Sequence, residues 1–302
     1  MKRFLHRKKI FNMLLLATFV ITILLSGCSV QTSPDTEKTS QTDISPSASP
    51  LLKVTFLDVG QADSIFIKLP EGKTMLIDAG NNDDGKTIIN YIKKQGAKKL
   101  DAVVETHPHE DHIGAMDDII NTFEIGKIYM PNVTTTTRTF KDVLTSAAAK
   151  GLKITSAKGG MSIPLEGDVK IEILAPNSKK YEDLNNYSVV LKMTYKKTSF
   201  LFTGDAEKLS EDEMIKHNYD LKADVLKVGH HGSNSATSEE FLSAVSPKYA
   251  IISVGKNNEY GHPHKETLER LVAHGVKVYT TADNGNILVT SDGENIKISR
   301  AP

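Results

Sequence analysis

The sequence is poor in cysteine and has no excess of either charge. Cys28 is the only cysteine among 302 residues, so the chain cannot form an internal disulfide. With no other thiolate available, the metal ligands of a folded domain would have to be imidazoles or oxygens. Lysine and arginine number 37, as do aspartate and glutamate, so the whole chain exerts no general electrostatic attraction on a polyanion.

Long apolar runs are also scarce, and the one that occurs lies between residues 10 and 25, directly after five cations. This pattern predicts a signal peptide over residues 1–27. An uncleaved membrane anchor is the alternative, although the run is short for a bilayer span. The run ends in Leu25-Ser26-Gly27-Cys28, which resembles the lipobox of bacterial lipoproteins. We therefore expect lipidation of Cys28 and anchoring to a membrane.

The residues after the apolar run divide into a tether and one domain. Residues 28–50 are mostly Ser, Thr, Pro, Gln and Asp, the composition of a disordered linker that holds an anchored domain away from the membrane. The folded domain is predicted over residues 51–302. Loss of residues 1–27 removes five cations and no anion, which leaves 32 basic and 37 acidic residues. We expect no general attraction of this acidic chain to nucleic acid.

The apolar pattern predicts an α/β fold. Apolar residues between turn residues predict an opening β-meander at 53–59, 64–68 and 74–79. Further strands are predicted at 101–105, 127–130, 152–156, 169–174, 188–195 and 199–203. Helices are predicted at 86–95, 115–123 and 139–150. The last third alternates helix and strand and closes with a hairpin. In each half of the chain, predicted strands of a β-meander are followed by alternating helices and strands. This order predicts two mixed β-sheets flanked by helices, an αββα sandwich.

One run carries most of the chemistry: Thr106-His107-Pro108-His109-Glu110-Asp111-His112-Ile113-Gly114. It lies between a predicted strand and a predicted helix, where α/β sheets collect catalytic groups. Imidazoles together with carboxylates suit Zn, Mn or Fe, and the spacing can direct two pairs of ligands at two neighbouring metals. The alternative is a hydrophilic loop that is rich in histidine by chance, which three imidazoles and two carboxylates in six positions disfavour.

Two more histidine clusters and one carboxylate follow predicted strands. The clusters are His230/His231 and His262/His264, and Asp205 follows an apolar strand through Gly204. Because every cluster follows a strand or begins a helix, one sheet edge can present them all. Asp205 can bridge two cations through its two oxygens, and it can equally cap the helix that follows it.

These motifs resemble those of the metallo-β-lactamase-fold hydrolases, αββα sandwiches with a one- or two-metal centre between the sheets. The shared motifs are His-x-His-x-Asp-His, a Thr-Gly-Asp strand end and a later strand followed by histidine. More narrowly, four segments are similar to the extracellular hydrolase domain of the ComEC competence protein family. They are Phe56-Leu57-Asp58-Val59-Gly60-Gln61-Ala62-Asp63-Ser64, Leu76-Ile77-Asp78-Ala79-Gly80, Val228-Gly229-His230-His231-Gly232-Ser233 and Tyr260-Gly261-His262-Pro263-His264.

The resemblance implies two divalent cations, Zn²⁺ or Mn²⁺, and a ligand set for each. Metal 1 would be held by His107, His109 and Asp205. Metal 2 would be held by Asp111, His112, Asp205 and His230.

One ligand position departs from the wider superfamily, where many members have a histidine before the Gly-Asp strand. No histidine occurs here between His112 and His217. Asn186 or Asn185 stands in that place and would offer an amide oxygen to metal 1. An oxygen in place of nitrogen weakens the preference for zinc and favours Mn²⁺.

Two close cations would lower the pKa of a bridging water to near 7 and so supply hydroxide at neutral pH. We expect Asp111 to orient this nucleophile, and His231 and His262 to bind the phosphate or act as general acid. The predicted substrate contacts are Asp58, Gln61, Asp63 and Ser233. For the hairpin that contains the first three of these, a turn stabilised by Asp and Gly is the alternative.

The sequence therefore predicts a metal-dependent phosphodiesterase on the outer face of the cytoplasmic membrane. The ComEC resemblance implies a competence-related nuclease acting on DNA, and a role in DNA uptake would need a partner protein. The alternatives are a cell-wall phosphodiesterase of the phosphorylcholine esterase type and a surface binding protein without turnover. A local positive rim for DNA is predicted from Lys192, Lys196, Lys197 and Lys227.

Overall fold

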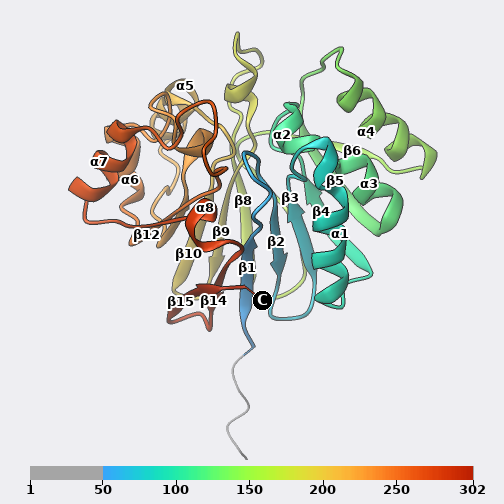
Figure 1. Ribbon diagram of the computed structural model, residues 1–302, viewed down its shortest axis with the longest axis horizontal. Helices are drawn as coiled ribbons and strands as arrows, with labels where there is room; N and C mark the ends of the chain where they lie inside the picture. The colour runs from blue at the N-terminus through green and yellow to red at the C-terminus, as the bar shows by residue number, and fades with distance from the viewer. Residues whose placement is uncertain (1–49, 302) are drawn as a thin grey trace, which may run out of the picture. The chain divides into compact units, whose positions relative to one another are not determined.

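The computed structural model describes residues 50–301, which form one compact unit. Two β-sheets pack face to face, and helices cover both outer faces (Figure 1). This confirms the predicted αββα sandwich. The predicted signal peptide, the lipidation site Cys28 and the linker up to residue 49 lie outside the described residues. Within residues 50–301, no helix has the length and apolar character needed to cross a membrane.

The strands form an eight-stranded and a seven-stranded sheet, in which neighbours far apart in sequence are paired. The first sheet has the order β15 (Ile296–Arg300), β14 (Ile287–Ser291), β1 (Leu52–Phe56), β2 (Ile65–Lys68), β3 (Thr74–Ile77), β4 (Lys99–Val104), β5 (Glu124–Pro131), β6 (Ile154–Ala157). The second has the order β13 (Lys277–Thr280), β12 (Tyr249–Ile252), β11 (Val225–Lys227), β10 (Thr198–Phe202), β9 (Val190–Tyr195), β8 (Val169–Ala175), β7 (Met161–Ser162).

The helices divide between the two outer faces. The first sheet carries α1 (Gly85–Lys94), α2 (Glu110–Ile113), α3 (Met116–Thr122) and α4 (Arg138–Ala149). The second carries α5 (Lys208–Lys216), α6 (Glu239–Val245), α7 (Lys265–Ala273) and α8 (Thr281–Asn284). Three short 3₁₀ segments complete the list: η1 (Asn82–Asp84), η2 (Leu184–Tyr187) and η3 (Gly229–Gly232).

Alternation along the strands creates three apolar layers. One face of each sheet packs against the other sheet, as Phe56 does against Phe202 with ring centroids 6.2 Å apart. The opposite face of the first sheet packs on α1, α3 and α4, and that of the second sheet packs on α5, α6 and α7. Because successive strand residues point to opposite faces, each central strand contributes to two layers. This burial holds the loops at the strand ends in place.

Parallel strands direct their carboxyl ends to one edge of the sandwich. Strands β3, β4 and β5 are parallel in the first sheet, as are β10, β11, β12 and β13 in the second. The loops after β4 and β10 meet there, since the imidazole of His112 lies beside the carboxylate of Asp205. The predicted histidine clusters all follow strands that end at this edge.

The predicted helix at 115–123 is confirmed as α3, but α2 precedes it and a break at Gly114 separates the two. The Gly114 backbone lies so close to Asn81 that a Cβ atom would come within 2.2 Å of its carbonyl carbon. Its N–H donates to the carbonyl of Gly80 at 2.8 Å. Only glycine permits this approach. The break therefore anchors the histidine-rich loop to the end of β3.

Candidate metal centre

Loops from both sheets bring most of the predicted ligands to one cavity of about 330 Å³. The His107–His112 loop follows β4, Asp205 follows β10, the histidine pair lies in η3 after β11, and His262 follows β12. The residues that line the cavity are Gln61, His109, Glu110, Asp111, Asn185, Asp205, His230, His231, Tyr260 and His262.

Asp205 lies at the centre of this cluster and is buried. Its Oδ2 is 3.3 Å from Nε2 of His112, 3.6 Å from Nε2 of His231 and 4.0 Å from Nε2 of His107. Asp111 completes the group, with Oδ2 3.2 Å from Nε2 of His231. One ligand atom from each of Asp111, His112, Asp205 and His231 lies within 4.8 Å of the others. Nitrogen and oxygen donors thus converge on a volume the size of a cation.

Three polar atoms of the residues around this cavity have no hydrogen-bond partner within the described part of the chain. They are Nε2 of His112, Oδ1 of Asp205 and Oδ1 of Asn185, and all three are buried. Buried polar atoms are normally paired, because an unpaired one loses its bonds to water without replacement. Imidazole nitrogens and carboxylate or amide oxygens are donors that Zn²⁺ and Mn²⁺ accept, so bound divalent cations would supply partners that the protein does not. The residues present therefore fit a metal centre.

The far nitrogens of the imidazoles are held by the protein, which fixes their orientation. Nδ1 of His112 lies 2.8 Å from Oδ2 of Asp78, and Nδ1 of His231 lies 2.9 Å from the carbonyl of Ser253. Asp78 also accepts bonds from the N–H and hydroxyl of Thr106. Such partners leave the opposite nitrogen free to bind a metal. Our sequence reasoning missed Asp78 as a site residue, although a carboxylate at the end of the strand next to β4 was a usable signal.

The charges in this cluster are strongly coupled. Burial disfavours a charged His112, yet the carboxylates of Asp205 and Asp111 raise its pKa well above the usual value. Burial likewise opposes charge on Asp205, but His112 and His231 hold its pKa well below the usual range. For His107, burial and then the charge of His112 lower the pKa. Metal binding would have to displace the proton of His112, because only a neutral imidazole binds a metal.

The geometry favours His231 over the predicted His230 as the ligand beside Asp111 and Asp205. The prediction assigns His230 to metal 2 and His231 to the phosphate, whereas Nε2 of His231 lies nearer to both Asp111 and Asp205. Nε2 of His230 is 3.8 Å from Asp205, and its Nδ1 is 3.3 Å from Oε1 of Glu207. Both histidines have positive φ, 47° and 50°, a strained conformation that directs both rings into the cavity. Glu207, which orients His230, was not predicted.

The family of the chain follows from comparison with known proteins. The model of the "Metallo-beta-lactamase superfamily" matches residues 57–256, which contain all of these candidate ligands. The chain belongs to the metallo-beta-lactamase superfamily. As a member of this superfamily, it is a hydrolase with a candidate metal site.

Its relatives in this superfamily include "Competence protein ComA" of Neisseria gonorrhoeae, which is 31% identical over 234 residues, covering 77% of this chain and 31% of that protein. The chain is 35% identical over 252 residues to "ComE operon protein 3" of Bacillus subtilis, which covers 78% of this chain and 32% of that protein. It is 32% identical over 257 residues to "Recombination protein 2" of Haemophilus influenzae, covering 83% of this chain and 30% of that protein. The chain thus spans about a third of the length of these relatives. The predicted resemblance to the ComEC family is confirmed.

Solved structures support the same fold at lower identity. A putative metal-dependent hydrolase from Parabacteroides distasonis superposes with a TM-score of 0.50 at 17% identity, covering 76% of this chain and 93% of that one. A variant of the β-hydroxylase CmlA superposes with a TM-score of 0.54 at 13% identity, covering 78% and 53%. These similarities concern the superfamily fold alone.

The structure separates the two asparagines that were candidates for the missing histidine. Oδ1 of Asn186 accepts a hydrogen bond from the backbone N–H of Ser210, so this side chain joins η2 to α5. Asn185 lines the cavity, and its Oδ1 has no partner among the described residues. Of the two asparagines that the sequence left open, the geometry therefore favours Asn185, because it faces the cavity.

Of the four predicted substrate contacts, only Gln61 reaches the cavity. Asp63 is buried behind His231, and its Oδ2 pairs with Nζ of Lys227 at 2.9 Å. The side chain of Asp58 is exposed outside the cavity lining, and that of Ser233 is buried against Ser235. Direct substrate contact is thus wrong for Asp63 and Ser233, because packing covers both, and unsupported for Asp58.

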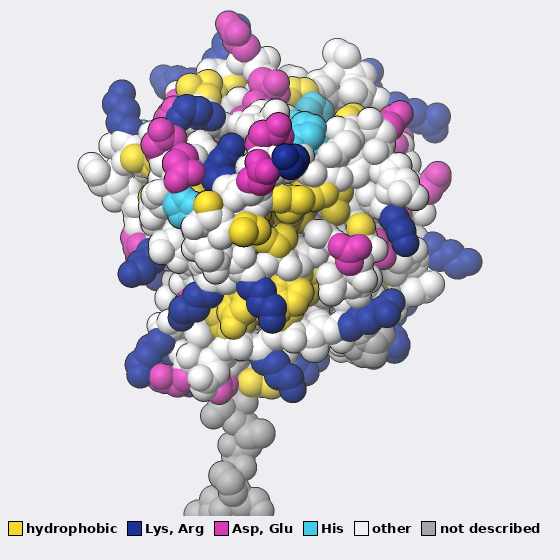
Figure 2. All heavy atoms as spheres, turned by 60° about the vertical axis from the view of Figure 1, so that its left-hand side comes forward, with side chains coloured by type: hydrophobic (Ala, Val, Ile, Leu, Met, Phe, Trp, Pro, Cys, Tyr) yellow, Lys and Arg dark blue, Asp and Glu magenta, His cyan; other side chains and the backbone are white. Residues whose placement is uncertain are grey.

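Three of the four lysines of the predicted positive rim, Lys192, Lys196 and Lys197, line a different cavity of about 440 Å³ and not the candidate metal site. Lys227 is buried and forms an ion pair with Asp63. Lys192 is buried and forms an ion pair with Asp220. Lys196 and Lys197 lie in the turn between β9 and β10, at the edge opposite the candidate metal site. Figure 2 shows one face of the molecule, on which lysine and arginine side chains lie in the upper as well as the lower part and histidines are visible in the upper part.

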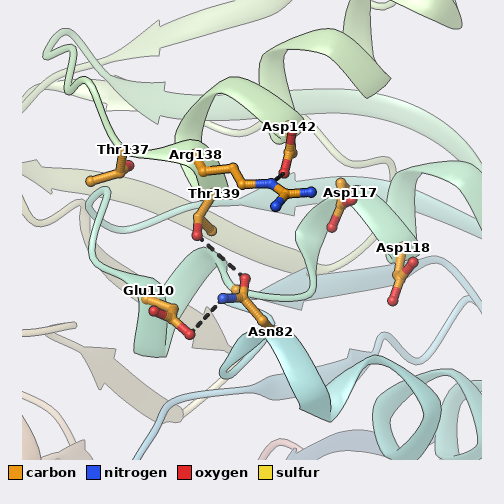
Figure 3. A pocket seen from close by; sticks show the side chains of 9 residues that line it. Asn82, Glu110, Asp117, Asp118, Thr137, Arg138, Thr139 and Asp142 are labelled. Atoms are coloured by element: carbon orange, nitrogen blue, oxygen red, sulfur yellow. Dashed lines mark hydrogen bonds and ion pairs between the residues drawn. The ribbon is translucent and has the colours of Figure 1, made fainter.

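A second and larger cavity of about 660 Å³ adjoins the metal site through Glu110 (Figure 3). Its carboxylates are Glu110, Asp117, Asp118 and Asp142, and its cation, Arg138, pairs with Asp142 at 3.4 Å. Asn82 donates to Glu110 at 2.6 Å across the floor of the cavity. Excess negative charge here disfavours an anionic group and favours a cationic one.

Proposed function

We propose that this domain is a metal-dependent phosphodiesterase that acts on DNA at the outer face of the cytoplasmic membrane, held there by a lipid anchor on Cys28. The observation that carries the proposal is the convergence of unpartnered nitrogen and oxygen atoms around Asp205, without any thiolate. The names of two relatives, which refer to recombination and to competence, support DNA as the substrate. A partner protein for DNA uptake belongs to the same proposal.

One or two divalent cations would be held by His107, His109, His112, Asp111, Asp205, His231 and Asn185. When bound, Zn²⁺ or Mn²⁺ would activate water and offset charge on the phosphoryl oxygens. In hydrolysis the water oxygen bonds to phosphorus, the ester P–O bond breaks, and the leaving oxygen takes a proton. Asp111 lines the cavity, so its carboxylate can orient the attacking water and accept the proton that the water gives up.

His262 is suited to hydrogen bonding and not to carrying charge. Burial, followed by the neighbouring His230, lowers its pKa to about 4. The amide nitrogen Nε2 of Gln61 lies 3.4 Å from Nδ1 of His262 and can donate a hydrogen bond to it. The neutral imidazole of His262 then carries its proton on its own Nε2, which it presents to the cavity. In that form it can donate a hydrogen bond to a phosphoryl or leaving-group oxygen. Of the two roles predicted for His262, phosphate binding therefore has the better support.

Cleavage assays on the purified protein with Mn²⁺ or Zn²⁺ test the proposal, with linear single-stranded and duplex DNA as substrates. We expect wild type to cleave DNA and Asp111→Ala to lose about a hundredfold or more in rate, because a group that orients water and holds metal is removed. Glu172→Ala, on β8 away from the cavity, is the control. No cleavage by wild type, or equal cleavage by Asp111→Ala, would contradict the proposal.

The acidic cavity beside Glu110 favours a second candidate, a cell-wall phosphodiesterase whose substrate carries a cationic group such as choline. Release of a chromophore from a choline phosphodiester, compared with DNA cleavage under the same conditions, separates the two. Preference for the choline ester, reduced in Asp117→Asn and Asp142→Asn, would support the second candidate.

A further inference from the structure

Tyr260 is an exposed aromatic side chain at the mouth of the metal site. It is 61% exposed, and it is the one aromatic residue among the exposed large hydrophobic residues of the described chain. Its ring lines the same cavity as Asp111, Asp205 and His231. Exposed apolar rings are unfavourable in water, so one held beside a reaction centre indicates contact with a ligand.

The ring is held in place, with one face free. It stacks on the imidazole of His262 with centroids 5.7 Å apart and an interplanar angle of 24°. Asn258 braces the loop, since its side-chain amide donates to the carbonyls of Gly255 and His262 at 2.9 and 2.6 Å. Its Oδ1 also accepts from the backbone N–H of His262 at 3.0 Å. The imidazole of His262 covers one face of the Tyr260 ring. Because Tyr260 is largely exposed, the other face of its ring is open.

We propose that Tyr260 is a stacking platform for a nucleobase next to the scissile phosphate, so that the substrate is single-stranded nucleic acid. The inference rests on the proposed phosphodiesterase function. No lysine or arginine lines this cavity, so electrostatic contacts from cationic side chains are not available to hold a strand. Stacking supplies affinity for any base, because every base has a flat π-face. A cavity of about 330 Å³ accepts a group the size of one nucleotide, and only an unpaired base can leave its strand to stack on the ring.

The test compares base-bearing and abasic single-stranded oligonucleotides of equal length. Tyr260→Ala should lower kcat/KM on the base-bearing substrate by about ten- to a hundredfold, mainly through KM, since stacking on one base is lost. The abasic substrate should lose far less, and Tyr260→Phe should recover most of the base preference. Tyr219→Ala is the control, because Tyr219 also stacks on an imidazole, that of His217, but lies outside the cavity.

Binding measured by fluorescence anisotropy separates this inference from the proposed function. Wild type should bind the base-bearing oligonucleotide several-fold more tightly than the abasic one, and Tyr260→Ala should bind both equally. Equal binding by wild type, or equal losses on both substrates in Tyr260→Ala, would overturn the inference. If wild type binds the base-bearing oligonucleotide more tightly but cleaves neither substrate, the proposed phosphodiesterase function is refuted and the base-binding role of Tyr260 is retained.

Discussion

Glu105 is a carboxyl group that the fold keeps away from water. It is fully buried at the end of β4, and neither of its oxygens has a hydrogen-bond partner within the described residues. Burial, followed by the charge of Asp78, raises its pKa from 4.5 to about 8. Between these two values the folded protein holds a proton that the unfolded chain releases. The free energy of unfolding therefore falls as pH rises through this window.

Replacing Glu105 by Gln should remove this pH dependence, since the amide has the same size and no proton to lose. In chelator, the stability of Glu105→Gln relative to wild type should increase steadily from pH 5 to pH 8. Urea unfolding at several pH values measures it. The control is Glu124→Gln, at the exposed start of the neighbouring strand β5. Parallel stability profiles for Glu105→Gln and wild type would contradict the assignment.

At the scale of elements, a buried ion pair joins the two sheets. Lys227 at the end of β11 is fully buried, and its Nζ lies 2.9 Å from Asp63 in the loop between β1 and β2. The backbone N–H of Asp63 donates to the carbonyl of Asp111 at 3.0 Å, and its carbonyl accepts from Gly80 at 2.8 Å. The pair thus connects β11 with the loops that carry the candidate metal ligands.

Removing one partner of this pair should be costly, because the other charge stays buried. We expect Lys227→Met to lower the free energy of unfolding by about 3–5 kcal/mol. The double variant Lys227→Met/Asp63→Asn should cost less than the sum of the two single changes. Urea unfolding of the four proteins measures the coupling. Lys248→Met is the control, since Lys248 is largely exposed in its pair with Asp224 and the pair should contribute less than about 1 kcal/mol. Strict additivity would show that the pair is not coupled.

At the scale of the whole molecule, the candidate metal centre exists only when both sheets are assembled. Its ligands come from the loops after β4, β10 and β11, about 120 residues apart at the extremes, as in the contact of His231 with Asp111. An unfolded chain does not bring these groups together. A metal that binds the folded state alone must therefore stabilise it by mass action.

Adding Mn²⁺ or Zn²⁺ to chelator-treated protein should raise the thermal midpoint. At a hundredfold excess over Kd the gain is about 2.7 kcal/mol, which corresponds to roughly 5–10 °C for a domain of this size. Calorimetry with and without metal measures the shift. Asp205→Ala should abolish most of it, whereas Asp224→Ala, at the opposite edge of the same sheet, should not. An unchanged midpoint, or an equal shift in Asp205→Ala, would argue against a metal centre at this position.

The sequence predicted the layers of the fold and the edge that carries the site, because both depend on local patterns. Periodicity located most strands and helices, and strand order along the chain brought the histidine clusters to one edge. It did not predict the partners of those groups. Asp78, Glu207 and the free face of Tyr260 became meaningful only when packing placed them beside His112, His230 and the cavity.

By itself the sequence determined the chemistry available: imidazoles and carboxylates at strand ends, no thiolate after Cys28, and no histidine where many relatives of this superfamily have one. The tertiary structure decided which of these groups converge. It brought His231 nearer than His230 to Asp111 and Asp205, turned Asn185 and not Asn186 to the cavity, and buried Asp63 and Lys227. The physical reason is that the two members of each pair are the same type of residue at adjacent positions, so the sequence alone does not distinguish them. Only backbone conformation and packing determine which of them faces the cavity.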